Sequence, residues 1–270
     1  MSLLGKLNEL QQQYRFAPSK KFSQNFLTDE TILARIVESA ELSAKDTVLE
    51  IGAGVGFLTN ALAPHCKKVI AVEFDEHLFD ALESELPSNA ILVRGDILSV
   101  KLPAFDKIVS TPPYDISSAL MHKLFRWKFK SAVLVFQLEF AEKLSAAPGF
   151  HNYNAISVLS QYYFEISLLF TVMAGSFFPP PGSDSSCLQL IRKKPSGRAK
   201  NDEKFELFVE QIFRFKNKNV EKALKIARPF LEKEMKLKSP EKVLEELELQ
   251  GKKVYQLDIP ELVQLFNALA

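Results

Sequence analysis

The sequence is poor in the two residue types that build most metal sites. Its 270 residues include only two cysteines and four histidines. They are scattered, with no CxxC pair and no HExxH pattern: Cys66, Cys187, His65, His77, His122 and His151. Two cysteines cannot build a disulfide framework, and without a CxxC pair, an HExxH pattern or a His/Cys cluster no metal cofactor is predicted. The scarcity of cysteine favours a reducing compartment, and we expect a cytoplasmic protein.

Long apolar runs are also lacking. The longest mostly apolar stretch, residues 166–178, is interrupted by Ser, Thr and Gly, whereas a membrane helix needs about 18 uninterrupted apolar residues. The N-terminal segment has no basic region followed by an apolar block, so neither a signal peptide nor a membrane partner is expected. Apolar residues still make up 47% of the chain, which is enough for a real core. The length allows one large domain, or one domain with a smaller appendix.

Short β-branched runs predict a sheet in the first two thirds of the chain. Seven strands are expected, at 47–51, 68–73, 90–94, 107–110, 132–136, 165–172 and 187–191. Segments with helical spacing separate the first five strands, which predicts a doubly wound, mostly parallel sheet. A Pro-rich loop separates the last two strands, so we expect them to close the sheet as an antiparallel hairpin. This is the α/β layout of the class I, Rossmann-like methyltransferase fold, with helices on both faces.

The sequence changes character near residue 194. A Pro, Ser and Gly-containing segment at 195–201 is typical of a linker. Four segments with helical periodicity and no strand-like alternation follow it, at 202–215, 220–234, 240–249 and 259–270. The expected organisation is therefore a sheet domain over residues 1–194 and a small all-α domain over residues 195–270.

Charge is unevenly distributed although the formal net charge is only +1. Residues 1–23, the basic N-terminal arm, carry +3, and residues 192–238 carry 15 basic against 7 acidic side chains. The segment between them is net acidic. Basic ends around an acidic centre favour a polyanionic partner that the ends contact, such as RNA. Solvated helix faces would give the same pattern, so this alternative stays open.

A glycine-rich loop follows the first predicted strand of the sheet. Glycines at 52, 54 and 56 allow a tight turn and let the backbone approach a ligand closely. Their GxGxG spacing differs from the GxGxxG of dinucleotide sites. Glu50 precedes the loop, and its carboxylate suits the amino acid part of S-adenosylmethionine better than a diphosphate.

Acidic residues end the next two predicted strands. Glu73 lies about 20 residues beyond the glycine loop, where a carboxylate can accept hydrogen bonds from both hydroxyls of a ribose. Asp96, in a Gly-Asp pair, can accept from an exocyclic adenine amine. Together with the loop, these two acids favour S-adenosylmethionine over NAD as the cofactor.

The fourth predicted strand ends in a stiff aromatic turn, Thr111-Pro112-Pro113-Tyr114, which we call the TPPY turn. In a sheet of this kind the turn faces the methyl donor. Two prolines restrict the backbone, so carbonyl groups and a ring can be aimed at a planar amine. The amine of adenine is a poor nucleophile because its lone pair is delocalised. Acceptors on its hydrogens, and a ring stacked on the base, would promote transfer by positioning and electrostatics.

These motifs together resemble the small-subunit ribosomal RNA adenine dimethyltransferase family, the KsgA-like enzymes. Residues 21–29 look like the QNFL motif of that family, and residues 177–185 resemble its FxPxPxxDS segment. The resemblance covers nearly the whole chain. It implies that Gln24, Asn25 and Leu27 contact the cofactor, that Ile97 lines its site beside Asp96, and that Phe177 lies near the target base with Tyr114.

The resemblance implies an S-adenosylmethionine-dependent enzyme that dimethylates the N6 amines of two adjacent adenosines in an immature small ribosomal subunit. We expect a monomer, with the helical domain and the basic N-terminal arm holding RNA. The family's catalytic motif is usually Asn-Leu-Pro-Tyr, whereas this chain has Thr111 and Pro112 in the first two places. Two alternatives stay open: an rRNA adenine methyltransferase with another target, and a catalytically weak ribosome-assembly or nucleic-acid-binding factor.

Overall fold

The computed structural model of the chain describes residues 1–19, 22–193, 197–236 and 238–270. The chain divides into two compact units, which are described separately. Unit 1 contains Met1–Ala141 and Glu165–Arg192, and unit 2 contains Glu142–Phe164 and Lys193–Ala270. The expected boundary between Lys194 and Pro195 lies outside the described residues, as do Lys20 and Lys21 of the basic N-terminal arm.

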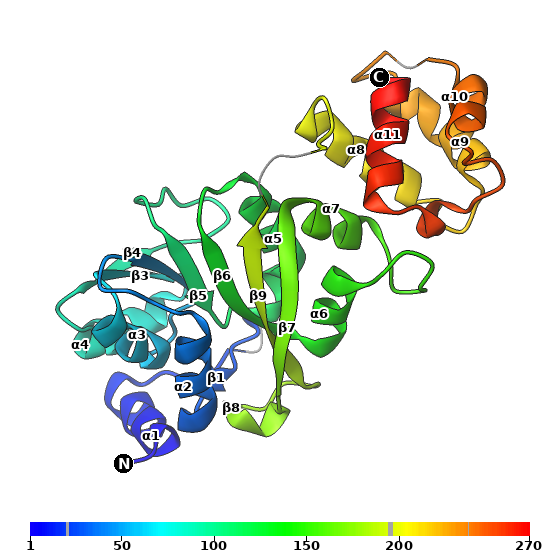
Figure 1. Cartoon of the computed structure of the whole chain (residues 1–270). Coiled ribbons are helices and arrows are strands. Elements are labelled where there is room, and N and C mark those ends of the chain that lie inside the picture. The colour runs from blue at the N-terminus through cyan, green and yellow to red at the C-terminus, as the bar shows by residue number, and fades with distance from the viewer. Residues whose placement is uncertain (20–21, 194–196, 237) are drawn as a thin grey trace. The chain divides into compact units, whose positions relative to one another are not determined.

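Unit 1 is built on a seven-stranded sheet in the order β4-β3-β2-β5-β6-β9-β7 (Figure 1). The strands are β2 (Thr47–Ile51), β3 (Lys68–Glu73), β4 (Ala90–Arg94), β5 (Lys107–Ser110), β6 (Ser131–Gln137), β7 (Phe164–Val172) and β9 (Ser185–Arg192). β2 pairs in parallel with β3 and β5, as do β3 with β4 and β5 with β6, whereas β9 is antiparallel to β6. The predicted α/β methyltransferase fold is confirmed. The strand order reverses between β2 and β5, where such sheets bind their ligands.

The central strands of the sheet are covered on both faces. Val48, Leu49, Val69 and Ile70 have no exposed surface, and residues 132–136 of β6 are at most 1% exposed. Helices accompany the strands in sequence: α1 (Leu3–Tyr14), α2 (Glu30–Ser39), α3 (Phe57–Leu62), α4 (Phe79–Glu85), α5 (Ser117–Arg126) and α6 (Leu138–Ser145). Single 3-10 turns are η2 (Ala63–His65), η3 (Glu76–Leu78), η4 (Tyr114–Ile116) and η5 (Ala174–Ser176). Continuous burial explains why these strands are apolar along their length.

A second, two-stranded sheet joins segments from the two ends of unit 1. β1 (Phe26–Leu27) is antiparallel to β8 (Phe177–Phe178), with Leu27 opposite Phe177. Thr28 extends this pairing, since its N–H donates to the carbonyl of Ser176 at 2.9 Å. The QNFL segment, residues 24–27, is thereby fixed beside the segment that contains Phe177.

Unit 2 is helical. It contains α7 (Ala155–Tyr163), α8 (Asp202–Phe213), α9 (Val220–Leu231), α10 (Pro240–Glu246), η6 (Val254–Gln256) and α11 (Ile259–Leu269). Residues 142–164, which the sequence analysis assigns to the sheet domain, cluster here because α7 packs on α8. The rings of Tyr162 and Phe205 lie 4.7 Å apart, and the Tyr162 hydroxyl donates to Asp202 at 2.6 Å. The last three residues predicted for the third helix, 247–249, lie beyond its end.

Candidate functional site

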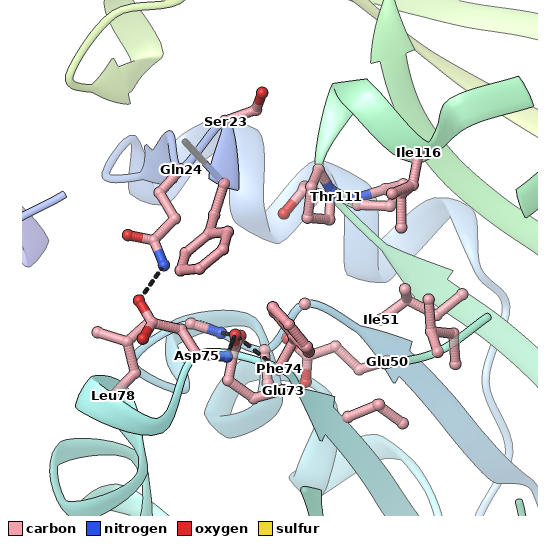
Figure 2. Close-up of a pocket in the computed structure, with 18 of the residues that line it drawn as sticks. Ser23, Gln24, Glu50, Ile51, Glu73, Phe74, Asp75, Leu78, Thr111 and Ile116 are labelled. Carbon is pink, nitrogen blue, oxygen red and sulfur yellow. Dashed lines mark hydrogen bonds between the residues drawn. The ribbon is translucent and has the colours of Figure 1, made fainter. Parts of the chain in front are cut away.

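A cavity of about 230 Å³ lies at the carboxyl ends of the parallel strands in unit 1. The residues that line it come from the QNFL segment, the glycine loop, the ends of β3 and β4, the TPPY turn and β8. Almost all the site residues expected from the sequence are among them: Gln24, Asn25, Leu27, Glu50, Gly52, Gly54, Glu73, Asp96, Ile97, Thr111, Pro112, Pro113, Tyr114 and Phe177. Figure 2 shows the acids Glu50 and Glu73 on the side of the pocket opposite Thr111.

The glycine loop brings the TPPY turn into contact with the end of β2. Gly52 has a φ of +72°, and a Cβ on it would lie 2.9 Å from Cδ of Pro113. At Gly54, with a φ of +60°, a Cβ would lie 3.1 Å from the ring of Phe26. Side chains are strongly disfavoured at both positions for steric as well as conformational reasons. The absence of side chains therefore lets the TPPY turn and the QNFL segment approach the glycine loop.

Gly56 differs from the other two glycines because it does not line the cavity. It precedes α3 with a φ of +85°, and a Cβ there would lie 3.0 Å from Leu82 of α4. Its position serves the turn into α3 and the packing of that helix on α4. The expectation that Gly56 contacts the cofactor finds no support in this geometry.

Glu73 ends β3 with its carboxylate held by backbone donors. Oε2 accepts from the N–H of Gly54 at 2.8 Å, and Oε1 accepts from Phe74 at 2.8 Å and Asp75 at 2.9 Å. Burial raises the pKa of Glu73, against these hydrogen bonds, which favour the charged form. A carboxylate offers about four acceptor positions, so capacity remains for a hydroxyl donor. The contact with Gly54 also fixes the glycine loop to the end of β3.

Glu50 is a buried acid beneath the glycine loop, with 2% of its surface exposed. The hydroxyl of Thr59 donates to its Oε2 at 2.5 Å. Burial raises the pKa of Glu50 to about 8, and the charge of Glu73 acts in the same direction. A buried acid with this pKa is stabilised in its charged form when a cation binds beside it.

Asp96 and Ile97 follow β4 at the next corner of the cavity. The N–H of Gly95 donates to the carbonyl of Glu73 at 2.8 Å, which holds the two strand ends together. Asp96 Oδ1 accepts the N–H of Leu98 at 2.8 Å, and Ile97 is 5% exposed. The arrangement presents a carboxylate and an apolar side chain side by side, as a purine with an exocyclic amine requires.

The TPPY turn is fixed at both ends by buried hydroxyl groups. Before it, the Ser110 hydroxyl donates to the carbonyl of Ile51 at 2.6 Å. Within it, the oxygen atoms of Tyr114 and Ser185 lie 2.7 Å apart, and the Ser117 hydroxyl donates to the carbonyl of Tyr114 at 2.8 Å. Burial raises the pKa of Tyr114. The phenol therefore stays protonated near neutral pH and serves as an anchored ring.

The sequence analysis missed several residues that line the cavity, and two of them matter for its geometry. Asp75 and Phe74 follow Glu73 and line the cavity. Asp75 Oδ2 accepts from Nε2 of Gln24 at 2.7 Å, whereas Phe74 is 56% exposed and its ring centre lies 5.4 Å from that of Phe22. The only sequence signal was a second acid two residues beyond Glu73, and it does not reveal a partner 51 positions away.

The pocket has the composition of a site for a cationic amino acid joined to a nucleoside. Two glycines form a cradle that side chains would fill, and three acids from successive strand ends surround it. Within the residues that the structure describes, no three His, Cys, Asp or Glu side chains gather as metal ligands would. The same residues include no helix long and apolar enough to span a membrane.

The sheet order, with a pocket at its reversal point, defines a Rossmann-like methyltransferase. A family model described as ribosomal RNA adenine dimethylase matches residues 15–264. The chain belongs to this family, whose members use S-adenosylmethionine as the methyl donor.

Curated relatives match three quarters or more of the chain. A protein of Thermococcus sibiricus named "Probable ribosomal RNA small subunit methyltransferase A" is 36% identical over 267 residues, 96% of this chain and 95% of its own. A protein of the same name from Methanosarcina acetivorans is 43% identical over 206 residues, covering 75% of this chain and 76% of its own.

Two solved structures are similar to this chain over most of its length. A dimethyladenosine transferase from Plasmodium falciparum is 29% identical with a TM-score of 0.78, covering 89% of this chain and 95% of its own. The 23S rRNA methyltransferase ErmE is 28% identical with a TM-score of 0.66, covering 91% and 99%.

Proposed function

We propose that this protein dimethylates the N6 amines of two adjacent adenosines in small-subunit ribosomal RNA, in the cytoplasm and during ribosome assembly. The observation that carries the proposal is the contact between Gly52 and Pro113. It brings the acid-lined half of the pocket against the TPPY turn, so that donor and acceptor sites share one cavity. The names of these two relatives support the small-subunit target.

Each pocket residue has a proposed part in holding the cofactor. S-adenosylmethionine bound here supplies an electrophilic methyl group. Glu73 accepts from the ribose hydroxyls, Asp96 accepts from the adenine amine, and Glu50 lies on the side of the amino acid ammonium. Ile97 and Leu27 pack on the bound molecule, and Asn25 contacts it from the QNFL segment. The backbone of the glycine loop approaches it closely because Gly52 and Gly54 carry no side chain.

The TPPY turn holds the target base without supplying a strong base. The turn follows β5 at the switch point, and its carbonyl groups can accept hydrogens of the adenine amine. Tyr114 and Phe177, both lining the cavity, stack on or beside the flipped base. Thr111 has a hydroxyl that accepts a hydrogen bond more weakly than an amide carbonyl does. Transfer then depends on alignment and on polarising the amine.

Unit 2 offers a surface for the RNA backbone. Lys222 and Lys225 lie three residues apart on exposed positions of α9, and Lys233 lies in the turn that follows. No ion pair joins any of the three to another residue that the structure describes. The exposed ring of Phe230 lies beside Lys233, whose Nζ is 5.8 Å from its centre. Unpaired lysines next to an exposed aromatic ring suit phosphates and an unstacked base.

Methyl incorporation tests the function directly. Purified protein, labelled S-adenosylmethionine and immature small subunits should give label in the small-subunit RNA. Dimethylated adenines stop reverse transcriptase, so primer extension should end at two neighbouring positions. Label in large-subunit RNA alone would favour the target named for ErmE. Binding to subunits with no label under saturating cofactor would favour an assembly factor.

A further inference from the structure

Asp75 is a buried acid that the proposed chemistry does not use. It lies two residues beyond Glu73, has 6% of its surface exposed and lines the cavity. Its Oδ1 accepts the backbone N–H of His77 at 3.1 Å and lies 2.9 Å from Nδ1 of the same residue. Its Oδ2 accepts from Nε2 of Gln24 at 2.7 Å, the contact drawn at the edge of the pocket in Figure 2. Both carboxylate oxygens are therefore occupied by the protein itself.

Gln24 is engaged at both ends of its side-chain amide. Nε2 donates to Asp75, and Oε1 accepts the backbone N–H of Ser19 at 2.7 Å. Its side chain therefore joins the segment before the QNFL motif to the end of β3. The resemblance implies a cofactor contact for Gln24, whereas the hydrogen bonds of its side chain serve the attachment of the segment to which it belongs.

A second contact runs beside the first. The rings of Phe22 and Phe74 meet edge to face with centres 5.4 Å apart and planes at 90°. Residues 22 and 24 are thus joined to residues 74 and 75 by one aromatic and one charge-assisted contact. The hydrogen bond from Gln24 to a charged, buried acceptor is the more directional of the two.

The attached segment forms a wall of the pocket. Asn25, Phe26 and Leu27 all line the cavity, and Phe26 covers Gly54. Leu27 also pairs with Phe177. The QNFL segment, which Gln24 connects to the end of β3, covers the cofactor side of the cavity, because the glycine loop and Glu73 lie directly beneath it. Opening at this point would expose the loop.

We propose that Asp75 is a positioning residue, which fastens the QNFL segment over the cofactor pocket through Gln24 and so sets the rate of cofactor exchange. The proposal rests on the proposed function, since it assigns S-adenosylmethionine to this cavity. Each adenosine needs two methyl groups, so the spent cofactor must leave and a new one enter between transfers. The contact between Asp75 and Gln24 is broken for each exchange and reformed for each transfer.

A polarity swap tests the contact. Gln24→Glu places two carboxylates against each other, and Asp75→Asn places two amide donors against each other. In the double variant the carboxylate at 24 can accept both from the Asn at 75 and from the N–H of Ser19. The Asn carbonyl can still accept from His77. The double variant therefore restores every hydrogen bond with the polarity of one of them reversed.

The measurements are the dissociation rate of tritiated S-adenosylmethionine without RNA, and the KM and kcat for the cofactor with small subunits. Each single variant should release cofactor about tenfold faster or more and raise KM by a similar factor, with kcat at saturation within about threefold of wild type. The double variant should return within about threefold of wild type. His77→Ala is the matched control, because it removes an exposed ring from the other oxygen and should leave the dissociation rate unchanged.

Two results would overturn the proposal. Unchanged dissociation rates in both single variants would show that the contact does not hold the wall. A second contrary result would be a lower kcat and a lower melting temperature alongside the higher KM in the single variants, with no recovery in the double variant. It would show a merely structural role. Failure of the wild-type protein to bind S-adenosylmethionine at all would instead refute the proposed function, so the two failures are distinguishable.

Discussion

The phenol oxygen of Tyr114 lies 2.7 Å from Oγ of Ser185, and this contact joins the TPPY turn to the first residue of β9. Ser185 is fully buried, so its hydroxyl gives the ring a fixed point inside the protein. The phenol is used for attachment and the face of the ring is left for the base. Tyr114 therefore acts in this proposal as a platform, and its hydroxyl takes no proton from the substrate.

If Tyr114 acts as a platform for the base, two substitutions at this position should have different effects. Tyr114→Phe keeps the ring and should retain most of the turnover. Tyr114→Ala removes the ring and should lower kcat/KM for the RNA by a factor that corresponds to about 1–3 kcal/mol of stacking. Affinity for S-adenosylmethionine, measured by calorimetric titration, should stay within about threefold in both variants. A loss in Tyr114→Phe as deep as in Tyr114→Ala would assign chemistry to the hydroxyl.

Glu73 should be the acid on which cofactor affinity depends most. Glu73→Ala removes the proposed acceptor for the ribose hydroxyls, and hydrogen bonds to charged groups contribute roughly 1.5–3 kcal/mol each. The same change leaves the N–H groups of Gly54, Phe74 and Asp75 without their acceptor, so the melting temperature should also fall.

The matched control for this acid is Glu83→Ala. Glu83 lies on α4 and its exposed carboxylate pairs with Arg94 at 2.6 Å. Its removal should leave both cofactor affinity and melting temperature near wild type, because exposed ion pairs contribute little. Calorimetric titration in which Glu73→Ala and Glu83→Ala bind alike would remove Glu73 from the site.

Glu50 should make cofactor binding depend on pH. Its pKa of about 8 in the free protein means that most of the carboxyls carry a proton at pH 7. An ammonium group beside it favours the charged form, so binding releases a proton and affinity should rise from pH 6 to about pH 8. Above that, the cofactor's own α-amino group, with an ordinary pKa of about 7.7–8.0, loses its charge. Glu50→Gln should weaken binding and flatten the rise.

The same group gives a stability signature of known sign. Because folding raises the pKa of Glu50 from an ordinary 4.5 to about 8, the folded state holds a proton that the unfolded state has lost. Its contribution to stability is thus fully present below pH 4.5 and is lost as pH rises through 8. The wild-type free energy of unfolding should fall relative to that of Glu50→Gln across this range. Denaturant titrations of both proteins at several pH values measure this difference. If the free energy of unfolding has the same pH dependence in both, the raised pKa is wrongly assigned to Glu50.

Gly52→Ala should damage both halves of the site at once. A methyl group there meets Cδ of Pro113 at 2.9 Å and requires a φ of +72°, which costs about 1–2 kcal/mol for residues other than glycine. We expect weaker cofactor binding and lower turnover together, since the loop and the TPPY turn must both shift. Gly175→Ala is the control, because nothing lies within 4 Å of its Cβ position. Normal titration and methylation by Gly52→Ala would contradict the shared-cavity geometry.

The lysines of α9 and of the turn after it should govern the salt dependence of subunit binding. Replacing Lys222, Lys225 and Lys233 with Gln should lower the slope of log affinity against log salt by roughly 2–3, at about 0.7–0.9 per phosphate contact. Filter binding at several salt concentrations measures the slope.

An equal loss of charge elsewhere is the control for this measurement. Lys45, Lys67 and Lys128 are exposed and lie shortly before β2, β3 and β6, at the edge of the sheet away from the pocket. Their replacement with Gln should leave the slope unchanged. If the two triple variants show the same salt slope, the lysines at α9 do not contact the RNA. Truncation at residue 194 is a poorer test, because residues 142–164 belong to the helical unit and would lose α8.

Local sequence patterns predicted the parts of the site that depend on local structure. The glycine loop, Glu73 and Asp96 each follow an apolar run that can be recognised in the sequence as a strand. Parallel strands bring their carboxyl ends to the same edge of the sheet. Gly56 follows the same pattern, but two residues beyond Gly54 the chain has reached the N-cap of α3, where a Cβ would meet Leu82 instead of the cavity. The contact between Gln24 and Asp75 could not be predicted, since no local rule relates two polar residues separated by 51 positions.

The pairing of β1 with β8 has a consequence for the order of synthesis. Phe26 and Leu27 leave the ribosome long before their partners, Phe178 and Phe177. Until about 150 more residues have been translated, a nascent chain can hold the glycine loop and all three acids, yet the wall over them has no partner strand. The wall over the cofactor pocket can therefore be completed only once about two thirds of the chain has been translated.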